Sequence, residues 1–438
     1  MKSKLVLLTV VMIITIVFAG CAPAATQAPA AAEPTQAPAA AEPTQAPAAA
    51  EPTQAPAAAC EIKFGLLLSL TGDLGDLGAA QLPAADIAIE EISAAGGPLG
   101  CKVTVVTEDD ESTAQAAVTG ANKLVLTDGA ISLLGLNSTD MVSLLDFARS
   151  NKVPIITHWG GTVKLDTEGG DYVFRNALSD SFCGVGTAKF LQDQGFKTAA
   201  NFYENSESPQ SNAVTMQKAF EASGGTVVTN VAFNPGQSSY QAELAKVFEN
   251  KPEIVLLSAG ADSATTIMRE WYRGNYGGKW ILGSDLGANE VVAGIGADVM
   301  VGLFGQTGAD DVESPSYQRF LELWKTKTGQ ESIAPYASAL YDAFILEALA
   351  IEIGGAATGE AINANMKKVT TGEVQCVSFA DCLKALKEGK TIRYMGVSGP
   401  LQFNKYNNVV APWVILQTEG DQWKTFKFYK ADNFVLPE

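Results

Sequence analysis

The sequence IKFGLLLSLTGDLGDLGAAQLPAADIAIEEISAAGGPLGCKVTVVT at residues 62–107 alternates two short apolar runs with one longer amphipathic segment. The runs at 62–69 and 103–107 are typical of strands that are buried on both faces, and the segment at 79–94 has helical spacing. Strands of this kind, separated by a helix, require a parallel sheet covered by helices. This stretch therefore predicts an α/β fold.

The same alternation continues along the chain on both sides of Arg175, where the pattern restarts. Further strands are expected at residues 130–135, 153–157, 198–203, 226–233, 254–258 and 280–283. Helices are expected at residues 113–126, 139–150, 182–194, 210–223, 239–250, 263–272, 316–328 and 336–353. The sequence thus predicts two doubly wound lobes with parallel sheets.

Two later segments have their own patterns. In the helix expected at 336–353, Leu340, Phe344 and Ile351 are spaced for one buried face. Residues 409–429 alternate as antiparallel strands do and lack helical spacing.

Residues 1–20 have the features of a secretory leader: Lys2 and Lys4, an apolar run at 5–18, and small residues before Cys21. The run is shorter than the roughly 20 residues that span a bilayer. Phe18-Ala19-Gly20-Cys21 resembles the lipobox of bacterial lipoproteins, in which Leu is usual where this chain has Phe. We expect Cys21 to carry acyl chains that hold the protein outside the cell membrane. The alternative is an ordinary secretory peptide that ends in cysteine.

Residues 22–59 are expected to be a disordered linker. The segment Ala-Pro-Ala-Ala-Ala-Glu-Pro-Thr-Gln occurs three times from Ala28 to Gln54 and has no large apolar side chain. Such a repeat cannot bury a core, and proline biases it toward extended geometry. Its expected role is to hold a folded body away from the membrane.

Charge and motifs exclude several classes of function. The chain has 30 basic and 48 acidic residues, a net charge of −18, which disfavours nucleic acid as a partner. It has one histidine, His158, and no zinc-protease, nucleophile-elbow or phosphate-loop motif. The acidic cluster at 108–111 lacks the alternate spacing of a calcium loop. We expect no enzyme, metal or cofactor, although a surface hydrolase using only carboxylates remains an alternative.

Five cysteines follow Cys21. Cys60 and Cys101 each precede a predicted strand, and adjacent parallel strands would bring them within disulfide reach. Cys376 and Cys382 enclose five residues and are expected to close that loop. Cys183 is then the odd thiol, expected to be buried near a helix start. Spacing alone does not fix this connectivity.

Polar residues follow several predicted strands, where ligands bind in open α/β sheets. The loop at 69–78, which includes Leu77, is rich in glycine, and the segment at 137–140 offers hydroxyls for a carboxylate. The loop at 157–162 carries a tryptophan onto which a ligand can stack. Asp285 follows another strand and offers a charge for an ammonium group. Each segment has an alternative interpretation. The loop at 69–78 could be a simple turn, and the segment at 137–140 a helix cap. The tryptophan at 157–162 could pack on its own lobe, and Asp285 could be a turn residue that caps the next helix.

Motifs spread over both lobes, from Ile62 to Phe403, match those of one known family. They are Lys63-Phe64-Gly65, Leu70-Thr71-Gly72, Gly96-Gly97-Pro98-Leu99-Gly100, Thr107-Glu108-Asp109-Asp110, Val153-Pro154-Ile155-Ile156, Phe174-Arg175-Asn176, Gly236-Gln237-Ser238-Ser239-Tyr240 and Gly399-Pro400-Leu401-Gln402-Phe403. In these motifs the chain resembles the leucine/isoleucine/valine-binding family of substrate-binding proteins of ABC transporters.

This resemblance implies a type I periplasmic-binding-protein fold with three hinge crossings, near Ala177, Thr307 and Pro400. The first lobe would comprise residues 60–177 and 308–399. The second would comprise residues 178–307 and 400–438. Such proteins close around a small ligand by hinge bending and deliver it to a membrane permease.

The resemblance also implies the site. Ser138 and Thr139 match the segment that binds the ligand carboxylate, and Asp285 matches the acid that binds its ammonium group. The chain departs from the family at His158-Trp159-Gly160-Gly161-Thr162 and at Ser208, where a tyrosine often closes over the ligand. The full set of expected ligand-binding residues is Leu77, Ser138, Thr139, Trp159, Gly161, Thr162, Ser208 and Asp285.

The expected function is capture of an amino acid, amide or short peptide for an ABC permease, by a protein anchored outside the cell through lipid. A tethered sensory module without a permease remains an alternative. No nucleic acid partner is expected.

Overall fold

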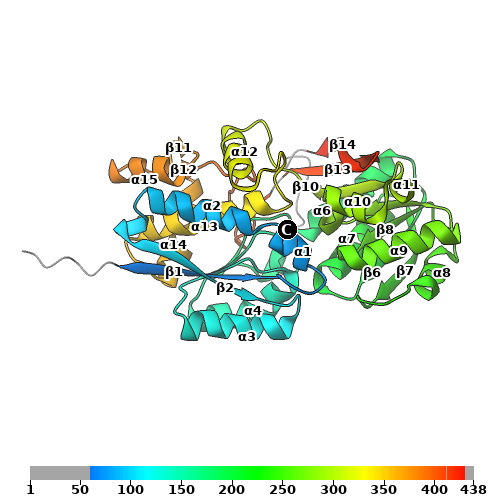
Figure 1. Cartoon of the computed structure of the whole chain (residues 1–438), viewed down its shortest axis with the longest axis horizontal. Helices are drawn as coiled ribbons and strands as arrows, with labels where there is room; N and C mark the ends of the chain where they lie inside the picture. Colours follow the sequence, from blue (N-terminus) through cyan, green and yellow to red (C-terminus); the bar gives the residue numbers. More distant parts are fainter. Residues whose placement is uncertain (1–59, 411, 430–438) are drawn as a thin grey trace, which may run out of the picture. The chain divides into compact units, whose positions relative to one another are not determined.

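The computed structural model describes residues 60–410 and 412–429 (Figure 1). These residues belong to one compact unit, Pro56–Glu438. The predicted leader at 1–20, the lipidation site Cys21 and the linker at 22–59 lie outside the described residues. Among the described residues, no helix combines the length and the apolar character that a membrane crossing requires.

The first sheet is entirely parallel, with strand order β2-β1-β3-β4-β5. Its strands are β1 (Glu61–Leu68), β2 (Lys102–Asp109), β3 (Leu133–Leu134), β4 (Ile155–Thr157) and β5 (Val173–Arg175). The parallel arrangement predicted from residues 62–107 is confirmed, with Ile62 opposite Val103. The sequence did not predict β5, which is only three residues long.

Helices cover both faces of the first sheet. They are α1 (Gly75–Ala79), α2 (Leu82–Ala94), α3 (Ala114–Asn122), α4 (Ser138–Asn151), α5 (Leu165–Glu168) and α13 (Ala337–Gly354), and α3 continues into a π turn, η2 (Lys123–Thr127). Side chains from α2 and α13 fill one core, whereas side chains from α3 and α4 fill the other. We call the α2 and α13 side the first core. The first sheet is therefore doubly wound, as predicted.

The second sheet is mixed, with strand order β14-β13-β10-β9-β8-β6-β7. Its strands are β6 (Thr198–Glu204), β7 (Thr226–Phe233), β8 (Ile254–Ser258), β9 (Lys279–Leu282), β10 (Phe304–Gly308), β13 (Trp413–Glu419) and β14 (Gln422–Tyr429). The strands β13 and β14 are antiparallel, as the alternation at 409–429 predicted. The remaining strands are parallel, with β13 joining them antiparallel to β10.

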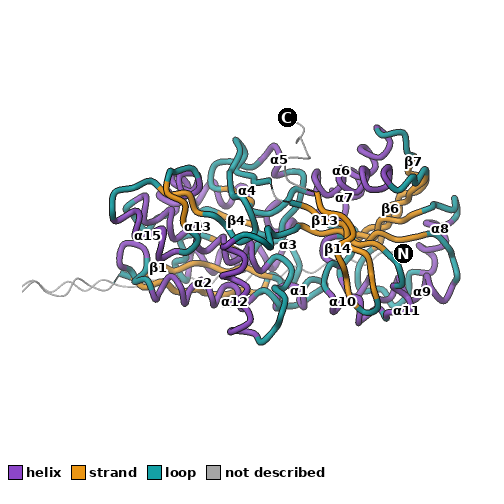
Figure 2. Tube along the Cα trace, turned by 90° about the horizontal axis from the view of Figure 1, so that it is seen from above, coloured by secondary structure: helices purple, strands orange, loops and turns teal. Residues whose placement is uncertain are grey.

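Helices also cover both faces of the second sheet, as Figure 2 shows from above. They are α6 (Asp180–Asp193), α7 (Glu207–Ala222), α8 (Gln241–Phe248), α9 (Ala261–Gly274), α10 (Asn289–Ile295) and α11 (Ala297–Met300). The helices α6 and α7 pack on one face, and α8 to α11 pack on the other.

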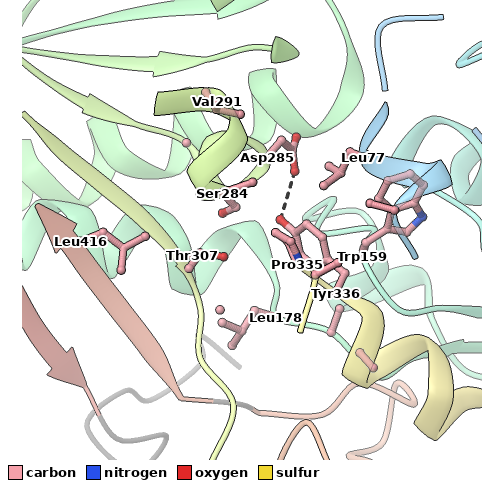
Figure 3. A pocket seen from close by; sticks show the side chains of 18 of the residues that line it. Leu77, Trp159, Leu178, Ser284, Asp285, Val291, Thr307, Pro335, Tyr336 and Leu416 are labelled. Atoms are coloured by element: carbon pink, nitrogen blue, oxygen red, sulfur yellow. Dashed lines mark hydrogen bonds between the residues drawn. The ribbon is translucent and has the colours of Figure 1, made fainter. Parts of the chain in front are cut away.

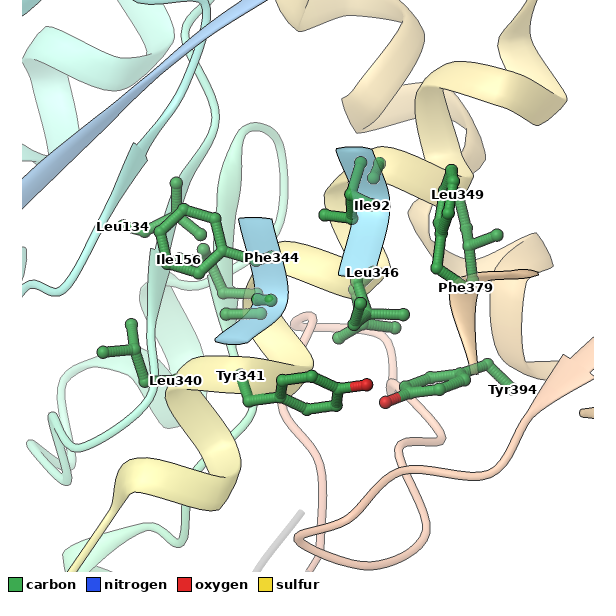
Figure 4. Close-up of a cluster of buried hydrophobic side chains, with 14 of the residues drawn as sticks. Ile92, Leu134, Ile156, Leu340, Tyr341, Phe344, Leu346, Leu349, Phe379 and Tyr394 are labelled. Carbon is green, nitrogen blue, oxygen red and sulfur yellow. The ribbon is translucent and has the colours of Figure 1, made fainter. Parts of the chain in front are cut away.

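The helix α13 corrects one prediction. The sequence placed Leu340, Phe344 and Ile351 on a single buried face, but every residue from Ala337 to Ile351 is buried. The reason is that α2, α14 (Gly359–Asn365) and α15 (Phe379–Lys387) pack around α13 as well as the sheet. Figure 4 shows side chains of α13 meeting Ile92 of α2, Phe379 of α15 and Tyr394.

The remaining elements extend the first core. They are α12 (Pro315–Thr328), the two-stranded sheet of β11 (Val374–Cys376) and β12 (Ile392–Tyr394), and the short turns η1 (Pro98–Gly100), η3 (Ser284–Leu286) and η4 (Met366–Thr370). The sequence did not predict β11, β12, α14 or α15.

Two disulfides close loops of the first sheet and its extension. Cys60 is joined to Cys101 and Cys376 to Cys382, the pairs expected from the sequence, and Cys183 is free and buried. Lys102 N donates to Cys60 O at 3.0 Å, so the first pair lies where β1 and β2 begin side by side. The second pair ties β11 to the start of α15.

The chain passes between the two sheets after β5, after β10 and before β13. The sequence placed the last passage near Pro400. In the structure, Leu401 and Val409 belong to the first core, and Arg175 forms a parallel bridge with Asn408. The last passage therefore lies between Val409 and Trp413.

Candidate ligand-binding site

A cavity of about 940 Å³ lies between the ends of the two sheets. Its wall includes residues that follow β4 in the first sheet and β8 and β9 in the second, together with the start of α13 (Figure 3). The carboxyl ends of parallel strands are where open α/β sheets bind ligands. The volume is near the upper end of the 300–1,000 Å³ usual for small-molecule sites.

Tyr336 and Asp285 connect the two sides of the cavity. The Tyr336 hydroxyl, next to the first turn of α13, donates to Asp285 Oδ1 at 3.0 Å, and Asp285 follows β9 (Figure 3). Burial raises the pKa of Asp285 to about 6, and the bond from Tyr336 opposes that rise. The carboxylate is thus largely ionised at pH 7 and can accept a hydrogen bond from an ammonium group.

Trp159 and His158 form part of the first-sheet wall. Trp159 Nε1 donates to Gly135 O at 2.6 Å, and the indole stacks on the His158 ring at 5.5 Å. The indole also meets Tyr336 edge to face at 6.2 Å. Burial lowers the pKa of His158 to about 3, so the imidazole is neutral at pH 7 and brings no positive charge to the cavity.

All ionisable carboxyl or cationic side chains of the wall are acidic, apart from the neutral His158. The described residues that line the cavity include six carboxylates and neither lysine nor arginine. Ser338 Oγ donates to Asp310 Oδ1 at 2.8 Å, and burial raises the pKa of Asp310 to about 7. Asn212 Nδ2 donates to Asp180 Oδ1 at 3.0 Å, and burial raises the pKa of Asp180 to about 8.

The structure brings five of the eight predicted binding residues to the cavity wall. These are Leu77, Trp159, Gly161, Ser208 and Asp285. Asp285 accepts a hydrogen bond from Tyr336, and no side chain caps α10. The alternative interpretation of Asp285 as the cap of that helix is therefore wrong.

Ser138, Thr139 and Thr162 are not in the wall. Ser138 Oγ instead accepts a hydrogen bond from Thr162 N at 3.1 Å, and Thr162 Oγ1 donates to Glu207 Oε1 at 2.7 Å. The N-cap of α4 is Asn137, which forms a capping box with Asp140. The polar atoms of this segment therefore hold the loop after β4 to its neighbours.

Sequence reasoning missed Tyr336, Asp180 and Asp310. Asp180 follows the N-cap Ser179 at the start of α6, so in the sequence it has the place of an ordinary acidic residue in the first turn of a helix. Tyr336 reads as the beginning of a helix, but its backbone has φ 64°, a region that is uncommon for a bulky residue. Such a conformation does not show in the sequence.

Within the described part of the chain, no group of three or more His, Cys, Asp or Glu residues is placed to hold a metal ion.

The fold and the cavity define a two-sheet α/β protein that is built to enclose a small solute. Residues 61–419 match the family described as periplasmic binding protein, and the chain belongs to this family. The family and fold are those of solute-binding proteins and not of enzymes.

Known relatives are distant but cover most of the chain. The leucine-, isoleucine-, valine-, threonine- and alanine-binding protein of Pseudomonas aeruginosa is 24% identical over 72% of this chain and 85% of its own length. The solved leucine-binding protein LivK of Thermotoga maritima has a TM-score of 0.74 and 21% identity, covering 85% of this chain and all of that one.

A second solved structure has a different kind of ligand. The ABC-transporter solute-binding protein of R. palustris in complex with benzoate has a TM-score of 0.70 and 20% identity, covering 84% of this chain and 96% of that one. At these identities the solved structures show the fold, which is the type I periplasmic-binding fold expected from the sequence.

Proposed function

We propose that this protein captures a small amine-bearing solute, an amino acid, amide or short peptide, and delivers it to the membrane subunits of an ABC permease. The observation that carries the proposal is the Asp285 carboxylate, held by Tyr336 in the wall of the cavity between the sheets. Family membership and relatives whose names state that they bind amino acids support the solute-binding role.

Two lobes that move as hinged bodies are part of the proposal. The first would comprise residues 60–177 and 308–399, extended by the segment up to Val409 that packs in the first core. The second would comprise residues 178–307 and the strands β13 and β14. Each would carry one sheet, and the ligand would be enclosed between the sheet ends.

Lipid anchoring at Cys21 and a linker over 22–59 complete the proposal. The protein would act outside the cytoplasm, where disulfides such as Cys60–Cys101 persist. Two or more acyl chains suffice to hold a protein stably at a membrane.

Thermal-shift screening against amino acids, amides, urea and short peptides tests the function. A ligand at 100 times its dissociation constant adds about 2.7 kcal/mol to the free energy of unfolding. A clear rise in melting temperature with at least one amine-bearing compound is expected. If no nitrogenous compound raises it, the proposed function is wrong.

The charge reversal Asp285→Lys tests the role of the carboxylate itself. It would place an ammonium group where we expect the ligand's ammonium group, so binding of an amine should be lost. Unchanged affinity would remove Asp285 from the site.

A further inference from the structure

We propose that the cavity selects a cation without a free carboxylate, such as an amino amide or a diamine, over a zwitterionic amino acid. This inference rests on the proposed function and narrows its substrate class. It follows from three features of the wall: its charge, one buried carboxyl oxygen that lacks a strong hydrogen-bond partner, and the lack of a cationic partner for a ligand carboxylate.

The first feature is the charge of the wall. Six acidic residues face the cavity, with neither lysine nor arginine among the described lining residues. Three of them are buried enough for the pKa to rise, to about 8 for Asp180, about 7 for Asp310 and about 6 for Asp285. A buried carboxylate is costly unless it is paired, and a cationic ligand would supply that pairing.

The second feature is Asp180. Its side chain is 4% exposed, and its Oδ2 is buried in the cavity wall with no donor but the Ser208 hydroxyl beside the carboxyl. Buried polar atoms are nearly always hydrogen-bonded, so an atom left over in a cavity wall points to a donor from a ligand. An N–H group of an amine or amide is such a donor.

The surroundings of Asp180 set its charge state. Burial raises its pKa most, Asp285 and Asp166 add to the rise, and Ser208 and the Arg175 guanidinium oppose it. Arg175 is itself paired with Asp166. The Asp180 carboxyl is therefore mostly protonated at pH 7 before a ligand binds, and a bound cation would favour release of that proton.

The third feature is that no cationic side chain faces a ligand carboxylate. Ser138 does not line the cavity, and His158 is neutral. The Arg175 guanidinium donates to Gly161 O and Thr162 O, each at 3.0 Å, and does not line the cavity.

Three helix N-termini beside the cavity do not compensate. The partial positive charge of a helix N-terminus would ordinarily favour an anion. Here the first turns of α6, α9 and α10 each carry an acidic side chain that lines the cavity, namely Asp180, Asp262 and Glu290. A ligand carboxylate at the ends of α9 and α10 would meet a like charge, whereas the first turn of α13 carries no acid.

Matched ligands test the proposal. Leucine and leucinamide differ only at the carboxyl group, and putrescine serves as a diamine; each is titrated into the protein at pH 7 by calorimetry. Leucinamide or putrescine should bind at least tenfold more tightly than leucine, about 1.4 kcal/mol. Binding of the cation should also release protons, seen as an enthalpy that depends on the ionisation heat of the buffer.

Variants assign the effect to Asp180. Asp180→Asn keeps the shape of the side chain, and it should reduce the proton release and lower the cation affinity at least tenfold. Asp298→Asn, an exposed position on α11, is the matched control and should change neither. If Asp180→Asn leaves both readouts unchanged, the assignment is wrong.

The outcomes separate this inference from the function on which it rests. Tighter binding of leucine than of leucinamide and putrescine would overturn the cation preference and leave an amino-acid-binding protein. Failure of every nitrogenous compound to bind would overturn both.

Discussion

Tyr336 lowers the pKa of the carboxylate that we place opposite the ligand amine. Burial drives the pKa of Asp285 upward, to about 6, and the hydroxyl of Tyr336 opposes the rise because it donates a hydrogen bond to the ionised form. An ammonium group binds the ionised form, so affinity should fall as the pH drops through about 6.

Tyr336→Phe is expected to move that fall to higher pH. Loss of the bond raises the pKa of Asp285, and hydrogen bonds to charged groups contribute about 1.5–3 kcal/mol. Affinity for an amine at pH 7 should therefore drop about tenfold or more in titrations from pH 5 to 8. Tyr272→Phe, an exposed tyrosine on α9, is the control. An identical pH midpoint in Tyr336→Phe and wild type would contradict the role of this bond.

At the scale of single residues, the sequence predicted which loops line the cavity better than it predicted which hydrogen bonds their side chains form. The loops after β1, β4 and β9 were expected to face a ligand because carboxyl ends of strands form one edge, and Leu77, Trp159 and Asp285 do line the cavity. Ser138 was expected to bind the ligand carboxylate, but it does not line the cavity, and its Oγ accepts a hydrogen bond from Thr162 N. Which hydroxyls are occupied depends on tertiary contacts, which local sequence does not contain.

At the scale of elements, α13 is unusual because it is buried all round from Ala337 to Ile351 and still carries two buried acids, Asp342 and Glu347. Asp342 is satisfied: Tyr394, Val397 and Ser398 donate to it. Glu347 accepts from Ser132 Oγ at Oε2, and its Oε1 is buried without a partner. Burial raises the pKa of Glu347 to about 8.

Glu347 should therefore make stability depend on pH. Its folded-state pKa lies above the unfolded value, so its contribution is fully present below about pH 4.5 and is lost as pH rises through about 8. Glu347→Gln keeps the hydrogen bond and never ionises, so its stability should fall less between pH 5 and 9, by an amount on the order of a few kcal/mol.

Urea unfolding at several pH values measures this difference. The exposed Glu249→Gln is the matched control and should follow the wild type. If Glu347→Gln loses as much stability as the wild type over this pH range, Glu347 is not the group responsible.

The longer buried strands were predictable from their apolar runs. The apolar runs of β1, β6 and β8 gave the expected strands because burial on both faces leaves a continuous apolar signal. The strands β5, β11 and β12, of three residues each, and β10, of five, were not predicted. The complete burial of α13 was not predictable either, because it depends on α14 and α15 packing from later in the chain.

At the scale of the whole binding unit, two carboxyl groups meet across the sheet ends. Asp73 follows β1 in the first sheet, and Glu204 ends β6 in the second. A Cβ atom on Gly260 would lie 2.0 Å from Asp73 Oδ2, and Gly260 N donates to Glu204 Oε2 at 3.3 Å. Burial, and then the proximity of Asp73, raise the pKa of Glu204 to about 8.

This pair should make closure of the two lobes depend on pH. Below pH 8 Glu204 is mostly protonated and can share a hydrogen bond with Asp73, whereas above pH 8 Glu204 is mostly ionised and is repelled by the neighbouring carboxylate. The repulsion of two charges 4 Å apart is about 1 kcal/mol in water and about 4 kcal/mol at an effective dielectric of 20. We therefore expect the ligand-free protein to open as the pH rises from 6 to 9.

Small-angle scattering measures this opening as a larger radius of gyration at pH 9 than at pH 6. Glu204→Gln keeps one side of the pair neutral, so its radius should not change over the same range, and Glu249→Gln should behave as the wild type. Because Asp73 and Glu204 belong to different sheets, a change that Glu204→Gln removes has to arise from the relation between the lobes and not from unfolding within one of them. An equal expansion in the Glu204→Gln variant would mean that other groups hold the lobes together.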